Sequence, residues 1–488
     1  MSFWGSLCLA AKDIRVAFRL NFLKPRFIFQ PQLDFVMSNY RAVIFVDLKD
    51  RDLMGDALIV HQLEKLGVTC HLEPLETWRS AVHAYEPHLI LFNHLTVKHL
   101  ADFSQELKDW NVLVGCLMNE GLLYFPGERT FCSKRQDEHM HCDLYLTWND
   151  VHRAELIEHA FCTPPEMAHT IGCPRFDFYK EPWSRVYQQP RHDDGLPVIL
   201  VNATFALAHY YTMPRENADR FFEPWVNKIE EVKDYWQLIE AQYKGRETMP
   251  SYIEPLIKSG DYRVIIRPHP REELAFYHEW IARMSPEEQE RVSLSTNEPP
   301  PVAIFKSDIV INCEDCTTSM EAWLAELPTI TIALEQNPYW FSETYKRLSP
   351  ISYAPEELER MIKSALADPV QPDYQPLRQE HLEKWLHSTD GQCALRAAEE
   401  IATLIKEKNL TPRVPFSIRG SWKKWKLLIL KAINEPYNAR LKHVVRRLFA
   451  GKQEQVSIRY RDYLKAIRRS QVEEAREAIS EAESRTSS

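Results

Sequence analysis

The chain has 488 residues, of which 44% are hydrophobic and 26% are charged, and its formal net charge is −9. This composition is typical of a globular protein of two or three domains, and it excludes disordered, collagen-like and repeat-array chains. No continuous apolar run approaches the ~20 residues of a transmembrane helix, which excludes a polytopic membrane protein. Glycine is scarce, at 13 residues, and neither GxxxxGK[ST] nor GxGxxG occurs. Any phosphate site must therefore be built without a glycine-rich loop.

Charge is distributed unevenly along the chain. Residues 415–470 contain 15 Lys and Arg against 3 acids, a net charge of +12, which leaves −21 for the rest. A basic segment on an acidic body predicts a surface that meets an anionic partner, either membrane lipid or nucleic acid.

The ten cysteines follow no disulfide or zinc framework. Cys313 and Cys316 form a single CxxC, and Cys132 and Cys142 flank two histidines, whereas a structural zinc site normally needs two such pairs. We therefore expect reduced thiols in a cytoplasmic protein. Residues 1–36 lack the features of a signal peptide and predict a basic lead-in, which leaves both Met1 and Met37 open as the native start.

The first half alternates buried strands with segments of helical length. A helical pattern runs from Leu53 to Leu66 and ends at Gly67, a residue suited to the position after a helix. A proline-rich, charged stretch over 180–197 predicts a linker. Continuous apolar runs predict parallel strands buried on both faces at 41–47, 88–93, 112–118, 143–147 and 169–172.

The same alternation starts again in the second half. A long polar helical insertion is expected over 214–258, and a helical segment over 376–406 closes the core. Further strands are predicted at 197–202, 263–267, 292–294, 308–312 and 329–334. The fold class predicted is α/β, with two Rossmann-like domains facing a cleft and a mainly helical basic C-terminal extension; two α/β domains without a shared cleft are the alternative.

This organisation predicts five segments. The last 18 residues, rich in Glu and Ser, are expected to form a solvated tail. The segments are a basic lead-in (1–36), a first Rossmann-like domain for the acceptor (37–190), a second for the donor (191–370), a closing helix (371–410), and a basic amphipathic arm with an acidic tail (411–488).

The end of the predicted strand 263–267 carries the most informative motif. Arg267 is followed by His269, Pro270 and Arg271, so cationic and imidazole donors stand where a strand ends. Anionic ligands bind at the carboxyl ends of strands in such sheets, and Arg suits bidentate recognition of phosphate. The motif predicts a phosphate-binding turn; a rigid strand exit with solvated charges is the alternative.

A second motif follows the predicted strand 308–312. The hydroxyl residues Thr317, Thr318 and Ser319 open a helix, where free backbone N–H groups attract phosphate, and Glu321 could reach ribose hydroxyls. Thr318 and Glu321 also have the spacing of a capping box, a purely structural alternative.

Carboxylate and amide groups stand at further predicted strand ends. Glu120, between Asn119 and Gly121, follows the strand 112–118 and is the best-placed general base, although it could equally fix its loop. Asn202 and Thr204 follow the strand 197–202 and could point into the cleft.

Arg175 lies in a Pro- and aromatic-rich segment between the two predicted domains. It is a candidate for contact with the acceptor or the other domain, and pairing with Asp177 is the alternative.

Taken together, these motifs resemble the bacterial surface carbohydrate biosynthesis proteins, which are similar to GT-B glycosyltransferases, and also resemble the donor-site motifs of capsule polysialyltransferases and Kdo transferases. The resemblance covers roughly residues 37–400. The segments that carry it are Asp47–Gly67, Gly172–Phe178, Val198–Phe205, Arg267–Glu272 and Asn312–Ala322.

The resemblance implies roles for several of these residues. His269 and Pro270 match a His-Pro motif that contacts the phosphate or base of CMP, and 317–319 match a Ser/Thr motif at the phosphate-binding helix. Residues 119–121 are similar to an acidic-acidic-glycine motif that carries the base. Asn119 departs from its first acid, so the base and the inverting or retaining outcome stay open.

The resemblance also implies transfer without a metal. Arg267, His269 and a helix N-terminus could stabilise a departing phosphate in its place. The single DxD triplet, Asp50-Arg51-Asp52, lies in the other half and also suits a helix start. We expect neither a metal nor a cofactor beyond a nucleotide-sugar co-substrate linked to CMP.

The predicted function is transfer of a sugar, such as Kdo or a sialic-acid-like sugar, from a CMP donor onto a surface polysaccharide or lipid-linked acceptor. Residues 415–470 are expected to bind the anionic inner face of the cytoplasmic membrane, because Trp422–Lys431 and Leu441–Phe449 mix cations with apolar residues at helical spacing. Nucleic-acid binding and packing on the core are the alternatives for this arm. A CDP-glycerol-type transferase and a non-catalytic membrane scaffold are the alternatives for the chain.

Overall fold

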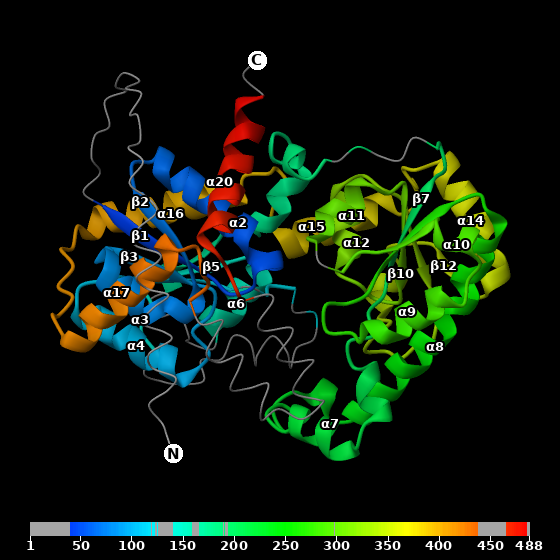
Figure 1. Ribbon diagram of the computed structural model, residues 1–488, viewed down its shortest axis with the longest axis horizontal. Helices are drawn as coiled ribbons and strands as arrows, with labels where there is room; N and C mark the ends of the chain where they lie inside the picture. Colours follow the sequence, from blue (N-terminus) through cyan, green and yellow to red (C-terminus); the bar gives the residue numbers. More distant parts are fainter. Residues whose placement is uncertain are drawn as a thin grey trace, which may run out of the picture. The chain divides into compact units, whose positions relative to one another are not determined.

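Two parallel β-sheets of six strands each organise the chain (Figure 1). The computed structural model describes residues 40–118, 120–122, 124, 140–158, 165–188, 190, 194–296, 298–437 and 465–485. The strand orders are β2-β1-β3-β4-β5-β6 and β12-β11-β10-β7-β8-β9. This confirms the predicted fold class, two Rossmann-like units with a helical C-terminal extension.

The first sheet forms from strands that are almost wholly apolar. Successive residues of β1 alternate between two cores, since Ile44 packs with helices α2 and α16 while Phe45 packs with α3 and α4 on the opposite face. The strands are β1 (Arg41–Val46), β2 (Thr69–Pro74), β3 (Leu89–Phe92), β4 (Leu113–Leu117), β5 (Leu144–Thr147) and β6 (Ala168–Thr170). The helices are α2 (Lys49–Lys65), α3 (Trp78–Tyr85), α4 (Lys98–Asp109), α6 (Asp150–Glu158) and α16 (Cys393–Lys408).

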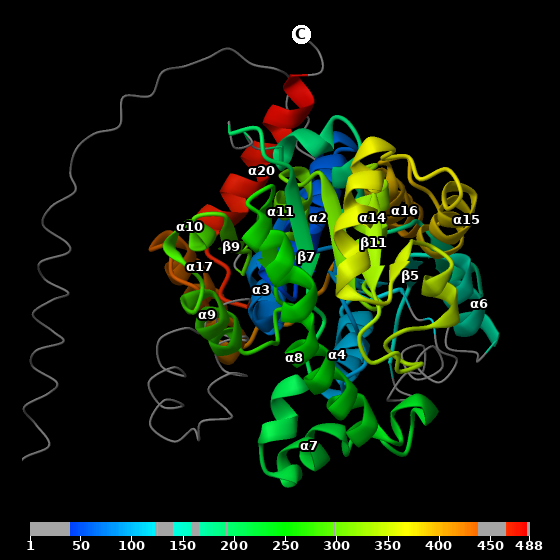
Figure 2. The ribbon, with the colours of Figure 1, turned by 90° about the vertical axis from the view of Figure 1, so that its right-hand side faces the viewer.

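The second sheet is covered in the same way. Helices α8 and α14 pack on one face, around Ile199 and Val264, whereas α11 and α12 pack on the other, around Leu200 (Figure 2). The strands are β7 (Val198–Asn202), β8 (Arg263–Arg267), β9 (Val292–Leu294), β10 (Ile309–Cys313), β11 (Thr329–Ile332) and β12 (Ile351–Ser352). The helices are α7 (Arg215–Phe222), α8 (Tyr235–Ser259), α9 (Leu274–Ala282), α10 (Pro286–Gln289), α11 (Pro300–Phe305), α12 (Thr318–Leu324), α13 (Glu343–Lys346) and α14 (Pro355–Ala367).

Each sheet has one point at which the strand order reverses. In the first sheet it lies between β1 and β3, and in the second it lies between β7 and β10. Ligands of doubly wound sheets bind outside the carboxyl ends of the strands at such points. The topology therefore directs the search for a site to two short edges.

The sequence predicted most elements, and the differences are confined to a few segments. Gly67 does follow the helix, with φ +82°, but β2 and β12 were not predicted. The expected linker contains a short 3-10 helix, Trp183–Val186, with Trp183 buried. The insertion is broken into α7 and α8, and the closing segment is two helices, α15 (Gln375–Leu386) and α16.

The expected solvated tail is wrong. Residues Arg469–Ser484 form helix α20, which packs on α2 with Ala475, Ile479 and Ala482 buried. Small and branched apolar side chains recur there at helical spacing, and the acids between them face solvent or pair with α2, as Glu483 does with Lys65 at 2.5 Å.

Several expectations fall outside the described residues. These are the lead-in 1–36, Met37, Asn119, Cys132 with its neighbouring His139, and the segment Leu441–Phe449. None of the helices in the described ranges is both long and apolar enough to cross a bilayer.

Replacing Ile479 by Ala tests the docking of α20. The side chain is fully buried, so we expect a loss of about 2–4 kcal/mol in unfolding free energy, seen as a lower urea midpoint of the first domain. Ser480→Ala on the exposed face is the control and should change stability by less than about 0.5 kcal/mol. Equal midpoints for the two variants would contradict the packing.

Candidate functional site

The carboxyl ends of β7, β8 and β10 bring predicted site residues together. Asn202, the last residue of β7, is in register with both Arg267 of β8 and Asn312 of β10. Asn202 donates from Nδ2 to Oδ1 of Asn312 at 3.0 Å, and the Thr204 hydroxyl donates to the carbonyl oxygen of Cys313 at 2.8 Å. Asn202 and Thr204 thus link β7 to β10 across the reversal point.

Two polar atoms at this reversal point remain unsatisfied. Oδ1 of Asn202 and Nδ2 of Asn312 are buried and have no hydrogen-bond partner among the described residues. Buried polar groups are normally paired, so an acceptor and a donor side by side at a strand edge mark a place for water or a polar ligand.

Arg267 is held in place at the end of β8. Its guanidinium donates from Nη1 to the Ser295 hydroxyl at 2.7 Å and from Nη2 to the Glu298 carbonyl at 2.9 Å. Burial lowers its pKa, against the attraction of Glu321 and Glu298. An arginine nevertheless stays charged in proteins, so this edge carries a fixed positive charge.

His269 is neutral and its tautomer is set by the loop. Burial, together with Arg271 and Arg267, lowers its pKa to about 4. The backbone N–H of Arg271 donates to Nδ1 at 3.2 Å. Because Nδ1 accepts, the neutral ring carries its hydrogen on Nε2, which can donate to an anionic oxygen.

A buried carboxylate fixes the loop that bears His269. Oε1 of Glu272 accepts from the backbone N–H of His269 at 2.7 Å and of Phe205 at 3.0 Å, and Oε2 accepts from the Tyr277 hydroxyl. Glu272 thereby ties the exit of β8 to the exit of β7. Burial raises its pKa to about 7, against these hydrogen bonds.

The remaining residues of the His-Pro motif differ in exposure. Pro270 is exposed, and the Arg271 guanidinium lies 4.7 Å from the centre of the Phe221 ring in helix α7. The insertion therefore places an aromatic ring, that of Phe221, beside the His-Pro motif.

The hydroxyl cluster opens α12 without capping it. Thr317 is the exposed residue before the helix, Thr318 is half-buried and Ser319 is buried, and no side chain caps the helix. The alternative capping box between Thr318 and Glu321 is therefore wrong. Glu321 lies further into the helix, buried, and its carboxylate accepts from the Tyr179 hydroxyl at 2.6 Å.

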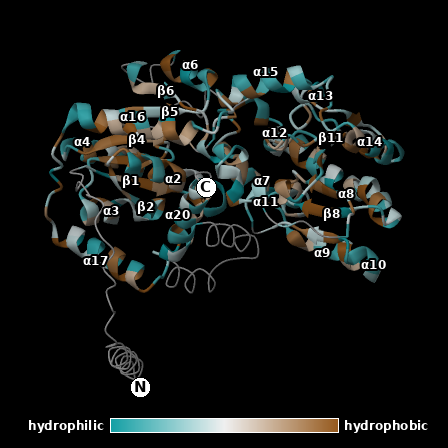
Figure 3. Cartoon of the chain, turned by 90° about the horizontal axis from the view of Figure 1, so that it is seen from above, coloured by the Kyte–Doolittle hydropathy of each residue, from teal (hydrophilic) through white to brown (hydrophobic). Residues whose placement is uncertain are grey.

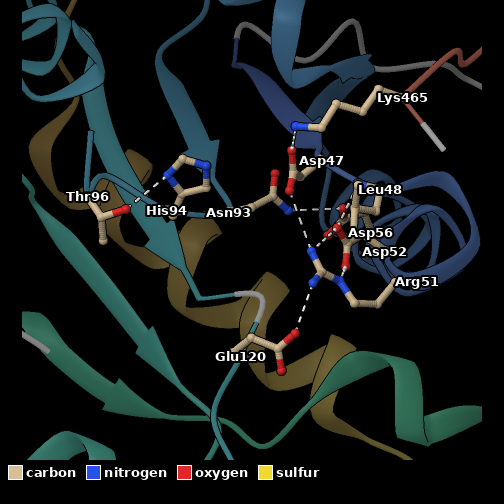
Figure 4. Close-up of polar contacts among 10 residues, drawn as sticks. All are labelled: Asp47, Leu48, Arg51, Asp52, Asp56, Asn93, His94, Thr96, Glu120 and Lys465. Carbon is tan, nitrogen blue, oxygen red and sulfur yellow. Dashed lines mark hydrogen bonds and ion pairs between the residues drawn. The ribbon is translucent and has the colours of Figure 1, made fainter. Parts of the chain in front are cut away.

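A second polar cluster lies at the reversal point of the first sheet (Figure 4). Arg51, in the first turn of α2, is at its centre. Its guanidinium is 2.6 Å from Asp52, 2.9 Å from Glu120 and 3.6 Å from Asp47. Glu120 is half-exposed and follows β4, so the predicted base stands at this edge, paired with an arginine that the sequence analysis did not single out.

The same edge holds a buried acid. Asp56 of α2 accepts from Nδ2 of Asn93, which follows β3, at 3.5 Å. Burial and the neighbouring Asp52 raise the pKa of Asp56 well above its ordinary value. Oδ1 of Asn93 has no partner among the described residues, and it lines a cavity of about 30 Å³. That volume is large enough to hold water.

Arg175 and Gly121 meet on one aromatic ring. The Arg175 guanidinium lies 4.8 Å from the centre of the Trp148 ring and 4.9 Å from that of Phe176, and its Nε has no partner among the described residues. A Cβ on Gly121 would lie 2.4 Å from the same Trp148 ring, so only glycine fits there. The alternative, a pairing of Arg175 with Asp177, does not form, because Asp177 accepts from the backbone N–H groups of Cys393 and Ala394.

The two edges differ in charge. The edge of the second sheet offers Arg267, Arg271 and a neutral imidazole, which suit a phosphate, whereas the edge of the first offers Glu120 and Asp56, which suit hydroxyl groups. Asp52 of the DxD triplet pairs with Arg51 and accepts from the Leu48 N–H at 2.9 Å, at the start of α2. In the described part of the chain no group of three His, Cys, Asp or Glu could hold a metal ion.

Sequence reasoning missed five of the residues that build these edges. Asn93 could have been found, because it is the last residue of a predicted strand. Asp56 and Glu272 differ from other acids only in being buried, which the sequence does not show. Arg51 and Tyr179 stand out only through contacts with residues distant in sequence. The five are Arg51, Asp56, Asn93, Tyr179 and Glu272.

Comparison with known proteins finds likeness of structure alone. No family profile and no curated protein sequence matches the chain. Among solved structures, the wall teichoic acid polymerase TagF solved with CDPG shares 14% identity over 78% of this chain and 91% of that chain, with a TM-score of 0.47. A UDP-N-acetylglucosamine 2-epimerase from Rickettsia bellii shares 12% identity over 75% of this chain and 98% of that chain, with a TM-score of 0.40. Anabaena HepE in complex with UDP-glucose shares 10% identity over 75% of this chain and 99% of that chain, with a TM-score of 0.38.

The strand orders themselves define the fold. Two doubly wound parallel sheets, each with its own reversal point, form two Rossmann-like domains in one chain.

Glu272→Gln tests the buried carboxylate. A folded-state pKa of about 7, above the ordinary 4.5, means that the folded protein binds more protons between these values. The stability of the natural chain should therefore fall as pH rises from 5 to 8, by on the order of 2 kcal/mol relative to the Gln variant. Urea unfolding of both proteins across this range measures the difference, and parallel pH curves would contradict it.

Proposed function

We propose that this protein is a glycosyltransferase that moves a sugar from a nucleotide-activated donor onto a glycan or lipid-linked acceptor. The observation that carries the proposal is the pair of Arg267 and neutral His269 at the carboxyl end of β8, beside the reversal point of a Rossmann-like sheet. Fixed positive charge and an imidazole N–H at such an edge suit the phosphate of a nucleotide.

On the donor side, the proposed chemistry is stabilisation of a leaving group. As the bond between the anomeric carbon and the phosphate oxygen breaks, negative charge develops on the phosphate. Arg267 and Arg271 would attract that charge, and Nε2–H of His269 would donate to one oxygen. The Thr317 and Thr318 hydroxyls supply further donors, and preorganised donors of this kind lower the barrier without rearranging.

On the acceptor side, Glu120 is proposed as the general base. As the oxygen of the acceptor hydroxyl bonds to the anomeric carbon, its proton would be transferred to the Glu120 carboxylate. Arg51, 2.9 Å away, orients Glu120. Asn202, Thr204, Ser319 and Glu321 are assigned to supporting the donor edge, and Arg175 and Gly121 to the acceptor edge.

Our finer proposal is that the donor is a CMP-linked acidic keto-sugar such as Kdo or a sialic-acid-like sugar. Three groups that can bind anions, Arg267, His269 and Arg271, stand within five residues, which suits a donor with a sugar carboxylate besides its phosphate. The product would be a bacterial capsule or lipopolysaccharide glycan, made by a peripheral enzyme at the inner face of the cytoplasmic membrane.

Thermal-shift titration with CMP, CDP, UDP and GDP in the absence of metal tests the donor. A ligand of the folded state at a hundredfold excess over its Kd stabilises by ~2.7 kcal/mol, so CMP should raise the Tm by several degrees. The shift should be lost in His269→Ala and persist from pH 8 to pH 5, because His269 stays neutral down to its pKa of about 4.

The exposed His278 of α9 supplies the matched control, since His278→Ala should keep the full shift. Preference for CDP would favour transfer of a polyol phosphate from a CDP-glycerol-type donor. Preference for UDP or GDP would replace the CMP donor by a conventional sugar nucleotide. If none of the four nucleotides raises the Tm, the proposal of an enzyme is overturned in favour of a non-catalytic scaffold.

Glu120→Gln tests the base. We expect the transfer rate to drop about 10²–10³-fold while the nucleotide shift is kept, because the side chain acts only on the acceptor hydroxyl. Glu166→Gln, an exposed glutamate in the first domain, should transfer at the normal rate. A Glu120→Gln enzyme with full activity would remove Glu120 from the mechanism.

A further inference from the structure

Helix α17 (Ile418–Ala432) mixes hydrophobic and hydrophilic residues along its length (Figure 3), and several of its large apolar side chains are exposed. It begins at the Ser417 cap, whose hydroxyl accepts from the Gly420 N–H at 2.9 Å. The helix lies beside α3 of the first domain (Figure 1).

The inward face fixes the helix on the domain. Leu427 is buried, and a Cβ on Gly420 would lie 2.7 Å from the His83 ring, so the backbone approaches α3 closely. Lys431 forms an ion pair of 2.5 Å with Glu73, a carboxylate that is almost fully buried in β2. These contacts set the rotation of α17 about its axis.

The outward face is a stripe of large apolar side chains. Five residues that follow one another at intervals of 4, 3, 4 and 4 share one side of a helix. They are Ile418 (84% exposed), Trp422 (68%), Trp425 (62%), Ile429 (56%) and Ile433 (61%), the last directly after the helix. Because the inward contacts fix the rotation, the stripe is held away from the domain.

The segment that carries the stripe contains basic residues and no acidic ones. The segment 416–434 contains five basic residues and no Asp or Glu. On a helix of 3.6 residues per turn, Arg419 and Lys426 flank the stripe on one side and Lys424 lies towards the inward face on the other. The segment thus joins exposed Trp and Ile side chains to a net positive charge.

We propose that α17 is a membrane-docking helix, which lies in the headgroup region of an anionic bilayer with the stripe Ile418–Ile433 turned into the lipid. Apolar side chains of this size gain free energy at the acyl boundary, Trp favours the interface, and the flanking cations attract anionic headgroups. The inference is independent of the proposed chemistry.

Charge and geometry favour lipid over other occupants. Single-stranded nucleic acids stack their bases on aromatic rings, whereas three of the five stripe residues, Ile418, Ile429 and Ile433, offer no ring for stacking. A second copy of the chain would place two cationic helices face to face, which like charges oppose.

Vesicle co-sedimentation of the full chain tests the proposal. Vesicles of phosphatidylcholine with 30 mol% phosphatidylglycerol should bind the protein, and those of phosphatidylcholine alone should bind it less. Trp422→Ala/Trp425→Ala should weaken binding at least tenfold, because interfacial binding scales with buried apolar area. Arg419→Gln, at an exposed cation that flanks the stripe, should weaken it about fivefold on the anionic vesicles and little on the neutral ones.

Matched variants show whether the location matters. Tyr353→Ala/Val370→Ala removes two exposed apolar side chains of the second domain and should leave vesicle binding unchanged. The Tm of each variant should equal that of the natural chain, because the replaced side chains are exposed. Nucleotide shifts should also be unchanged, which separates this test from that of the donor site.

Three outcomes would overturn the proposal. Equal vesicle binding by the Trp variant and the natural chain would remove the stripe from docking. Salt-sensitive binding to single-stranded RNA, without binding to vesicles, would make α17 a nucleic-acid surface. Self-association in sedimentation velocity that the Trp variant abolishes, again without vesicle binding, would make it a dimer interface.

Discussion

The geometry of the second sheet's edge depends on one buried carboxylate. Glu272 accepts two backbone N–H groups from loops that leave different strands, at His269 and Phe205, and a hydroxyl from Tyr277. Three donors on one carboxylate offset much of the free-energy cost of burying it. The cost that they do not offset is seen in the pKa of Glu272, which burial raises to about 7. Glu272 therefore adds a side-chain link between the loop of His269 and the exit of β7, beside the backbone hydrogen bond from Ala203 to Arg267. The tautomer of His269, and hence the donor at Nε2, follows from that loop geometry.

The first sheet's edge depends on an arginine in the same way. Arg51 forms ion pairs with Asp47, Asp52 and Glu120, which would otherwise repel one another, and these acids raise its pKa against the effect of burial. The two edges therefore have complementary characters, a cationic turn stabilised by a buried acid and an acidic cluster stabilised by a half-buried arginine. Both occur at the strand-order reversals, where the polypeptide leaves the carboxyl ends of neighbouring strands open.

The C-terminal part of the chain completes the first domain. Helix α2 is buried on several sides because α16 and α20 pack against it, and both come from beyond the second sheet. Helix α17 covers α3 of the same domain. A surface helix that is fixed on its inner face can present its outer face in a defined direction, which a flexible basic arm cannot do. This is why the docking proposal rests on α17 and not on the composition of residues 415–470.

The sequence by itself determined the strands, the two-domain repeat and the motif around His269. Continuous apolar runs predict strands that are buried on both faces, so β1, β7 and β10 were predicted, whereas the edge strands β2 and β12 are half polar or very short and were missed. Only the tertiary structure decided the roles of single polar groups. Asn202 and Thr204 link β7 to β10, Glu321 binds Tyr179, and Glu272 joins its own loop to Phe205. The sequence does not show these pairs, because their members lie 67 or more residues apart. Composition alone suggested a solvated tail, yet α20 packs on α2, since an apolar stripe becomes a core face only when the fold supplies a surface to cover.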